Sequence, residues 1–565
     1  MSGQEYPSPN SFKSFLQISI IVSIVIILTT CSSVGSVIVR TRIGQIRGLK
    51  LTTPKGTTYL SFRGIPYAQP PVKSLRFKAP VPISPWEGVF NGTDDGPVCP
   101  QLHIATNQVI GDENCLHVNV YSSDLDVLKP VIVFIHGGGF NTGAAASLIY
   151  GPDFIVDENI VLITIQYRLG VLGFLSTEDR VTPGNWGLLD QIEALNWVKS
   201  NVASFGGDPD KITVMGEGAG AASVSLLTLT TRARGLFGNM ILLGGTALNP
   251  QYLQKNPLES AKELGSRLQC NSYKDFQQLV DCIRASSTEN LVKEVNQMFH
   301  FFNFPRWFAP CIDNVLFDKT PEEIFQSGKF TKVPVLMGLA AHEAAFYYPL
   351  TLNSFNDGKY DGNFIDQRLP RLLPVISEFQ SKLFPTSRAL KKRYFTNINI
   401  DNEDEFRPRY IELLNDLLFT RFFSQYGNLL SEKNIPVYYF LLEYQGSNSI
   451  MQSLGDTEVK SIAHGDILQY LFSQILGEDR ELPADDEAFA RKTLIPLIVN
   501  FVKYSNPTPT NALGASWPKF TQEEPTVLSV GRELKLRPKF RTGILRYWAE
   551  ELPEIVSPKK RADEL

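Results

Sequence analysis

The chain has 565 residues, of which 43% are hydrophobic, and it carries a formal net charge of −4. This apolar content can bury a large core and excludes an intrinsically disordered chain. The nearly balanced charge gives no reason to expect a nucleic-acid partner. Residues 37–556 contain no internal repeat, low-complexity tract or linker. Helical and strand-like segments alternate throughout, which predicts one α/β domain with a large, mostly parallel central sheet and helices on both faces.

Residues 1–36 have the pattern of a secretory leader. Lys13 precedes an apolar run from Phe15 to Leu28, and small and polar residues follow as far as Ser36. That order suits cleavage by signal peptidase, whereas about fourteen apolar residues are short for a membrane span. We expect a cleaved signal peptide, with an uncleaved membrane anchor as the alternative, and no further membrane span.

The next predicted elements lead to a glycine-rich turn. Residues 131–135 are five apolar, mostly β-branched residues, which predicts a buried strand. The strand ends at the turn His136-Gly137-Gly138-Gly139-Phe140. Glycines there let backbone N–H groups approach a substrate oxygen closely.

A second strand and turn follow further along the chain. The apolar residues 212–215 predict a short strand, and the run Met215-Gly216-Glu217-Gly218-Ala219-Gly220 comes directly after it. This is the spacing of a Gly-x-Ser-x-Gly nucleophile elbow, a sharp strand-to-helix turn that holds its central side chain toward the substrate. Gly218 occupies the central position, so the turn carries no nucleophile.

The motifs together identify a known family. The supporting segments are residues 62–68 with 70–71 and 75–77, residues 112–116 with 119–121, residues 184–191 and residues 205–209. In this order they resemble the type B carboxylesterase and cholinesterase family, whose members have the α/β-hydrolase fold and read Gly-Glu-Ser-Ala-Gly at the elbow. The resemblance covers nearly all of the chain after the leader.

The resemblance also implies the other site residues. Glu343, in a loop that departs from the family pattern at Ala344, and His464, in the segment Ala463-His464-Gly465-Asp466, take the places of the catalytic acid and base. In a working triad the imidazole takes the serine proton and the carboxylate holds its tautomer. The N–H groups of Gly138, Gly139 and Ala219 take the places of the oxyanion-hole donors.

The family pattern assigns the cysteines as well. It implies disulfides between Cys99 and Cys115 and between Cys270 and Cys282, and it leaves Cys311 as a buried free thiol. The cysteines and histidines do not cluster at ligand spacing, so we expect neither a metal nor a cofactor. Arg168 and Asp190 are interpreted as a structural ion pair.

Two residues of the predicted active site differ from the family pattern. Besides Gly218, Gly244 stands where the family usually has a serine that supports the triad. Removing a triad member leaves roughly 10³ to 10⁴-fold catalysis over water. We therefore predict a catalytically inactive protein of the carboxylesterase type with a binding or regulatory role, which binds a hydrophobic ester-like ligand or a protein partner. A weak carboxylic ester hydrolase and a cholinesterase-like adhesion protein remain as alternatives, and the sequence leaves the oligomeric state open.

The remaining features concern processing and location. Asn91 begins the glycosylation sequon Asn91-Gly92-Thr93, which is expected in a secretory protein. Residues 557–565 end in Ala-Asp-Glu-Leu, similar to the Lys-Asp-Glu-Leu retrieval signal. We expect the endoplasmic reticulum lumen, with secretion as the alternative.

Overall fold

The computed structural model describes residues 35–103, 106–270, 275–299, 307–356, 364–453, 461–473, 482–510, 514 and 516–557. The predicted leader and the predicted retrieval signal lie outside the described residues, apart from Gly35, Ser36 and Ser557. Gly35 and Ser36, which we assigned to the leader, already belong to the first strand.

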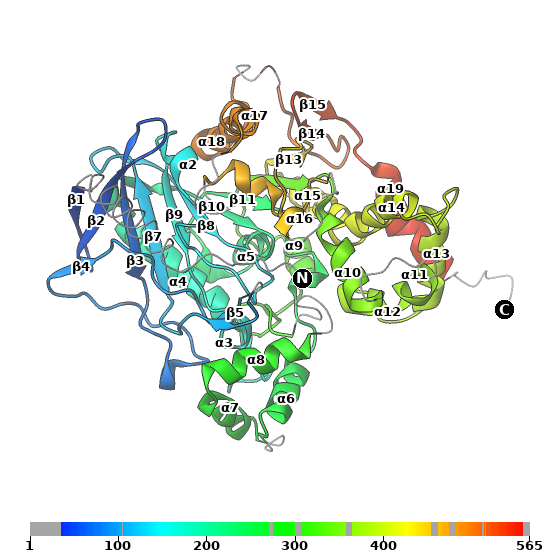
Figure 1. The fold of residues 1–565 in the computed structure, drawn as a ribbon, viewed down its shortest axis with the longest axis horizontal. Helices are drawn as coiled ribbons and strands as arrows, with labels where there is room; N and C mark the ends of the chain where they lie inside the picture. Colours follow the sequence, from blue (N-terminus) through cyan, green and yellow to red (C-terminus); the bar gives the residue numbers. More distant parts are fainter. Residues whose placement is uncertain are drawn as a thin grey trace, which may run out of the picture.

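One large mixed sheet organises the molecule (Figure 1). Within the described residues it has thirteen strands, in the spatial order β1-β2-β3-β7-β9-β8-β10-β11-β12-β13-β14-β15, with β4 beside β2. The strands are β1 (Gly35–Thr41), β2 (Gly44–Thr52), β3 (Thr58–Pro66), β4 (Val89–Asn91), β7 (His117–Ser122), β8 (Lys129–Ile135), β9 (Val161–Ile165), β10 (Gly207–Glu217), β11 (Asn239–Leu243), β12 (Val335–Ala340), β13 (Val437–Leu442), β14 (Val527–Val530) and β15 (Leu534–Arg537). The short strands β5 (Gln101–Leu102) and β6 (Val109–Ile110) pair separately.

The centre of the sheet is parallel and its two ends are antiparallel, except that β4 pairs with β2 in parallel. Each neighbouring pair from β9 through β8, β10, β11, β12 and β13 to β14 is parallel. The pairs β1-β2, β2-β3, β3-β7, β7-β9 and β14-β15 are antiparallel. The prediction of an α/β-hydrolase fold with a mostly parallel central sheet is confirmed, and the antiparallel ends are what the sequence analysis did not predict.

Alternating side chains of the central strands feed two hydrophobic cores. Val131 and Val133 of β8 point into one core, and Ile132 and Phe134 point into the other. Successive side chains of a strand face opposite sides, and a parallel sheet that is covered on both faces therefore reads as a continuous apolar run. Helices α4 (Trp186–Asn201) and α5 (Ala219–Leu227) cover the first core, and α2 (Asp153–Val156) and α18 (Ile495–Tyr504) cover the second.

The other helices surround this sheet at its ends and edges (Figure 1). Helices α6 (Pro257–Arg267), α7 (Phe276–Ala285) and α8 (Thr288–Met298) lie together below the sheet in this view. A group of helices lies to its right, comprising α10 (Tyr347–Asn356), α11 (Phe364–Gln367), α12 (Leu369–Ile376), α13 (Leu383–Tyr394), α14 (Glu403–Asn415), α19 (Thr542–Arg546) and α20 (Leu552–Val556). The remaining helices are α3 (Gly170–Phe174), α9 (Pro321–Ser327), α15 (Arg421–Ser431), α16 (Ile450–Ser453) and α17 (Ala484–Phe489).

Candidate active site

Four neighbouring parallel strands end at the same edge of the sheet, and each is followed by predicted site residues. Gly138 and Gly139 follow β8, Gly218 follows β10, Gly244 follows β11 and Glu343 follows β12. Ligands of open α/β sheets bind beyond the carboxyl ends of the strands. The register of the sheet therefore gathers at one place residues that are up to about two hundred positions apart in the chain.

Gly218 forms the turn between β10 and α5. Its φ of 55° and ψ of −118° place it in a conformation that glycine adopts without strain. Its N–H donates to the Leu243 carbonyl at 2.8 Å, and its carbonyl accepts from the Ala222 N–H at 3.0 Å. The turn is thus built like an elbow, but no side chain projects from its tip. On α5, buried Ser223 already accepts a hydrogen bond from Gln191 at 3.1 Å.

Glu343 and His464 form the predicted pair. Nδ1 of His464 lies 2.6 Å from Oε2 of Glu343, and the Ala340 N–H donates to Oε1 of Glu343 at 2.8 Å. The Glu343 side chain is buried, whereas that of His464 is partly exposed. A carboxylate fixed in this way holds the Nδ1–H tautomer of the imidazole and turns Nε2 toward the elbow.

Glu217, which the sequence analysis did not single out, is the second carboxylate beside His464. Its Oε1 lies 3.1 Å from Nε2 of the imidazole, and the residue is only 6% exposed. Burial raises the pKa of Glu217, while the charge of His464 lowers it and Glu343 raises it further. Glu217 matches the glutamate of the family pattern Gly-Glu-Ser-Ala-Gly, but the pattern alone does not show that its carboxylate lies beside the imidazole.

Gly218 and Gly244 both leave the space next to the imidazole free of a side chain. A Cβ atom placed on Gly218 would lie 2.9 Å from Nε2 of His464. A Cβ atom on Gly244, whose φ is 67°, would lie 2.9 Å from Nδ1 and Cε1 and 3.3 Å from Oε1 of Glu343. The ring of His464 therefore occupies space that a side chain at either position would require.

The three predicted oxyanion donors lie at the ends of β8 and β10. Gly138 and Gly139 have φ values of 102° and 63°, and Ala219 is the first residue of α5, where the first N–H groups have no partner within the helix. None of these three N–H groups donates a hydrogen bond to another described residue. Their role as an oxyanion hole remains a prediction.

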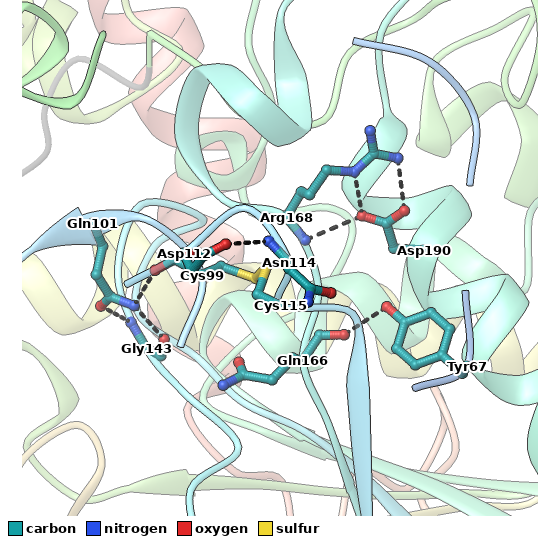
Figure 2. Close-up of a disulfide and its surroundings, with 10 residues drawn as sticks. All are labelled: Tyr67, Cys99, Gln101, Asp112, Asn114, Cys115, Gly143, Gln166, Arg168 and Asp190. Atoms are coloured by element: carbon teal, nitrogen blue, oxygen red, sulfur yellow. Dashed lines mark hydrogen bonds and ion pairs between the residues drawn. A yellow bond between two sulfur atoms is a disulfide. The ribbon is translucent and has the colours of Figure 1, made fainter. Parts of the chain in front are cut away.

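Gln101 connects the first disulfide to this glycine loop, as Figure 2 shows. Its amide donates to the Gly143 carbonyl at 2.8 Å and accepts from the Gly143 N–H at 2.8 Å, and it also donates to the Cys99 carbonyl at 3.0 Å. The loop that begins at His136 is thereby fixed at its far end. Such a contact joins segments forty residues apart and is not visible in the sequence pattern.

The other predicted residues are located as follows. The disulfides Cys99–Cys115 and Cys270–Cys282 are present, which confirms both pairings, and Cys311 is a buried free thiol. Arg168 and Asp190 form a buried ion pair at 2.7 Å, as expected (Figure 2). Asn91 is exposed at the end of β4, and its glycosylation stays a prediction.

Two further properties bear on the site. In the part of the chain that the structure describes, no helix has the length and apolar character needed to cross a membrane, and no three His, Cys, Asp or Glu side chains are grouped so as to hold a metal ion. A cavity of about 470 Å³ lies beside Glu343, and its lining includes the charged residues Glu443, Arg537 and Arg541. Glu343 and Phe419 line it, and the Phe419 ring centroid lies 5.6 Å from that of His464.

Comparison with known proteins adds a consistent set of relatives. The sequence pattern of the carboxylesterase family matches residues 35–548. An acetylcholinesterase of Bungarus fasciatus is 30% identical over 551 residues, which cover 94% of this chain and 89% of the relative. A cocaine esterase of Homo sapiens is 31% identical over 553 residues, covering 93% and 94%. A neuroligin-3 of Mus musculus is 28% identical over 580 residues, covering 92% of this chain and 69% of the relative.

Proposed function

Since this chain belongs to the carboxylesterase family, we propose that it is a non-hydrolytic member that binds a hydrophobic ester-like ligand without turning it over. The observation that carries the proposal is Gly218 at the tip of the elbow. Acyl transfer begins when a hydroxyl at this position attacks the ester carbonyl. Without that oxygen no acyl-enzyme can form.

The rest of the site still suits a carbonyl compound. The N–H groups of Gly138, Gly139 and Ala219 lie at the carboxyl edge of the sheet, where they can donate hydrogen bonds to a carbonyl oxygen. These features support binding, since they need no nucleophile.

Weak hydrolysis by water is the second candidate, and one distance favours it. The position of the missing Cβ lies 2.9 Å from Nε2 of His464, which is hydrogen-bonding distance for a water oxygen. A water there could lose a proton to the imidazole and attack a bound ester. Glu217 opposes this route, because its carboxylate already lies beside the same nitrogen.

We further propose that the protein resides in the secretory pathway. The leader-like residues 1–36 support this location, as do the two disulfides, since disulfides persist in oxidising compartments. The Ala-Asp-Glu-Leu ending favours the endoplasmic reticulum lumen. The similarity to a neuroligin supports the alternative that this protein binds a protein partner in place of an ester-like ligand.

The test is an ester assay of the purified protein on short-chain and long-chain aryl esters, with a fluorophosphonate probe for an activated serine. We expect no labelling, and turnover at least about 10³-fold below that of the Gly218→Ser/Gly244→Ser variant. A non-hydrolysable ester analogue should raise the apparent melting temperature of the natural protein, and His464→Ala serves as the control for water activation. Turnover by the natural protein that approaches the serine variant would overturn the proposal, and turnover that His464→Ala abolishes would identify the second candidate.

A further inference from the structure

A small cavity lies beside the glycine loop that follows β8. It has a volume of about 40 Å³ and is lined by residues 100–102, the start of α3, one side of α8 and two residues of the loop itself, Asn141 and Thr142. A water needs about 10 to 15 Å³ of such space, so the cavity admits a group of a few atoms and not a whole ligand. Much of its wall is apolar, since buried Leu172 and Val295 contribute to it.

Only one end of the Asn141 side-chain amide has a hydrogen-bond partner among the described residues. Asn141 is 9% exposed, and its Nδ2 donates to the Gly139 carbonyl at 3.0 Å. Because a carbonyl oxygen only accepts hydrogen bonds, this contact fixes which end of the amide is the nitrogen. Oδ1 is buried and receives no hydrogen bond from the part of the chain that the structure describes. A buried acceptor without a donor costs free energy, and a ligand that supplies the donor removes this cost.

Oδ1 of Asn141 lies at the edge of the cavity, next to Gly170. A Cβ atom placed on Gly170 would lie 3.4 Å from Oδ1, and Gly170 itself lines the cavity. Because glycine has no side chain, position 170 leaves the oxygen uncovered. The Gly170 N–H already donates to the Phe140 carbonyl at 2.7 Å, so this residue does not supply the missing donor.

The other polar side chains of the cavity wall are either hydrogen-bonded or exposed. The Gln101 amide bonds to the backbone through both its nitrogen and its oxygen, as Figure 2 shows. The Thr142 hydroxyl donates to a carbonyl of the glycine loop at 3.1 Å, and Asn296 is exposed on α8. Among the described side chains that line the cavity, Oδ1 of Asn141 is therefore the buried acceptor that is left for a ligand.

We infer that Oδ1 of Asn141 selects an ester-like ligand that carries a hydroxyl group a few bonds from its carbonyl. The inference deepens the proposed function and rests on it, since that function puts the ligand carbonyl at the N–H groups of Gly138 and Gly139, on the same loop as Asn141. The hydroxyl enters the small cavity and donates to Oδ1, while the rest of the ligand stays outside. Asn141 is thus a specificity-determining residue.

The size and chemistry of the cavity favour a hydroxyl over other groups. An amide N–H brings a carbonyl that needs room and a donor of its own, and an ammonium brings a charge that one neutral amide oxygen does not compensate. An apolar group in the same place leaves Oδ1 without a partner. A site built to hydrogen-bond a hydroxyl rejects an analogue that lacks it for this reason.

The test is calorimetric titration of the full-length natural protein with pairs of phenylalkyl methyl ketones. Such ketones imitate an ester carbonyl and cannot be hydrolysed. One member of each pair carries a hydroxyl, the other carries a methyl group in its place, and the pairs differ in the distance of this group from the carbonyl. We expect the best hydroxyl ketone to bind at least about tenfold more tightly than its methyl counterpart, which corresponds to about 1.4 kcal/mol.

Asn141→Leu removes the oxygen, and the ketone pairs separate this loss from a change in the loop. The variant also loses the contact of Nδ2 with Gly139, which affects both members of a pair alike. The ratio of their dissociation constants therefore reports on Oδ1, and we expect this variant to bind both members equally. Asn141→Ala is the second variant should Asn141→Leu fail to fold. Asn196→Leu, at an exposed position of α4, is the matched control and keeps the preference of the natural protein.

The outcomes distinguish this inference from the proposed function. Equal binding of hydroxyl and methyl ketones by the natural protein would overturn the inference alone, and so would a preference that survives Asn141→Leu. Binding of no ketone at all would refute the proposed function and the inference together. Hydrolysis of hydroxyl-bearing esters in preference to their methyl counterparts would refute the proposed function and support the inference.

Discussion

At the scale of single residues, a side chain at Gly218 would destabilise the fold for two reasons, the positive φ of the backbone and the closeness of His464. The two contributions to the loss of stability can be measured separately. Gly218→Ala introduces a Cβ atom at a φ of 55° and 2.9 Å from His464. Gly56→Ala introduces one at a φ of 88° with nothing within 4 Å. Strain of a side chain in such a backbone costs about 1 to 3 kcal/mol, and only Gly218→Ala adds the contact. We expect the apparent melting temperature to fall further for Gly218→Ala, and an equal fall would contradict the described position of His464.

The same residues show what a sequence can predict of a site. Gly218, Glu343 and His464 were predicted from motifs, since spacing along the chain fixes which residue follows which strand. Glu217 was missed, because its contact with His464 depends on where its side chain points, which the spacing of a motif does not specify. The meaning of Gly244 changed as well. The pattern indicated a lost supporting hydroxyl, and the structure shows that its missing Cβ also makes room for the ring.

At the scale of elements, the two disulfides close loops of similar length and differ in what they hold. The sequence separations are 16 and 12 residues, so loop entropy predicts a similar loss of about 3 kcal/mol when either is removed. Only Cys99–Cys115 holds Gln101 against Gly143 at the end of the glycine loop. In the background of Gly218→Ser/Gly244→Ser, replacing Cys99 and Cys115 by alanine should therefore slow fluorophosphonate labelling, and replacing Cys270 and Cys282 should not.

Both disulfide variants should melt earlier than their parent, which serves as the internal check on the comparison. Equal effects on labelling would mean that Gln101 does not position the loop.

Some strands could be predicted from the sequence and others could not. Residues 131–135 of β8 and 212–215 of β10 are buried apolar runs and were recognised, whereas the antiparallel strands β1 and β2 alternate between more exposed and more buried positions and gave no motif.

At the scale of the whole molecule, the free energy of unfolding depends on pH through two buried titratable groups, Asp416 and His136, which act in opposite directions. Burial raises the pKa of Asp416 to about 6 despite its ion pair with Arg541 at 2.6 Å, and it lowers the pKa of His136 to about 4. Between about pH 4 and pH 6 the folded state binds a proton at Asp416 that the unfolded chain releases, so this group stabilises the fold in acid and the contribution is lost as pH rises through about 6. His136 acts in the opposite direction, because its neutral form is the buried one.

The contribution of Asp416 can be isolated with one variant. Asp416→Asn cannot take up the proton, so it should lower the apparent melting temperature more at pH 5 than at pH 7. The difference between the variant and the natural protein is the measurement, since His136 affects both equally. A larger loss at pH 7 would mean that the ion pair with Arg541 outweighs the burial of the carboxyl group. Neither the raised pKa nor its partner could be predicted from the sequence, because Asp416 and Arg541 are brought together only by the fold.

The location of the site residues just beyond the ends of the central strands affects which substitutions this protein can tolerate. Gly138, Gly218, Gly244 and Glu343 follow four different strands, and the hydrogen bonds of the sheet hold each strand independently of the residue beyond its end. A substitution at the edge therefore alters reactivity while the ladder that positions its neighbours stays intact. Folding and chemistry are encoded in separate parts of the chain, which allows the family architecture to lose a reaction and still keep a shaped binding site for selection to act on.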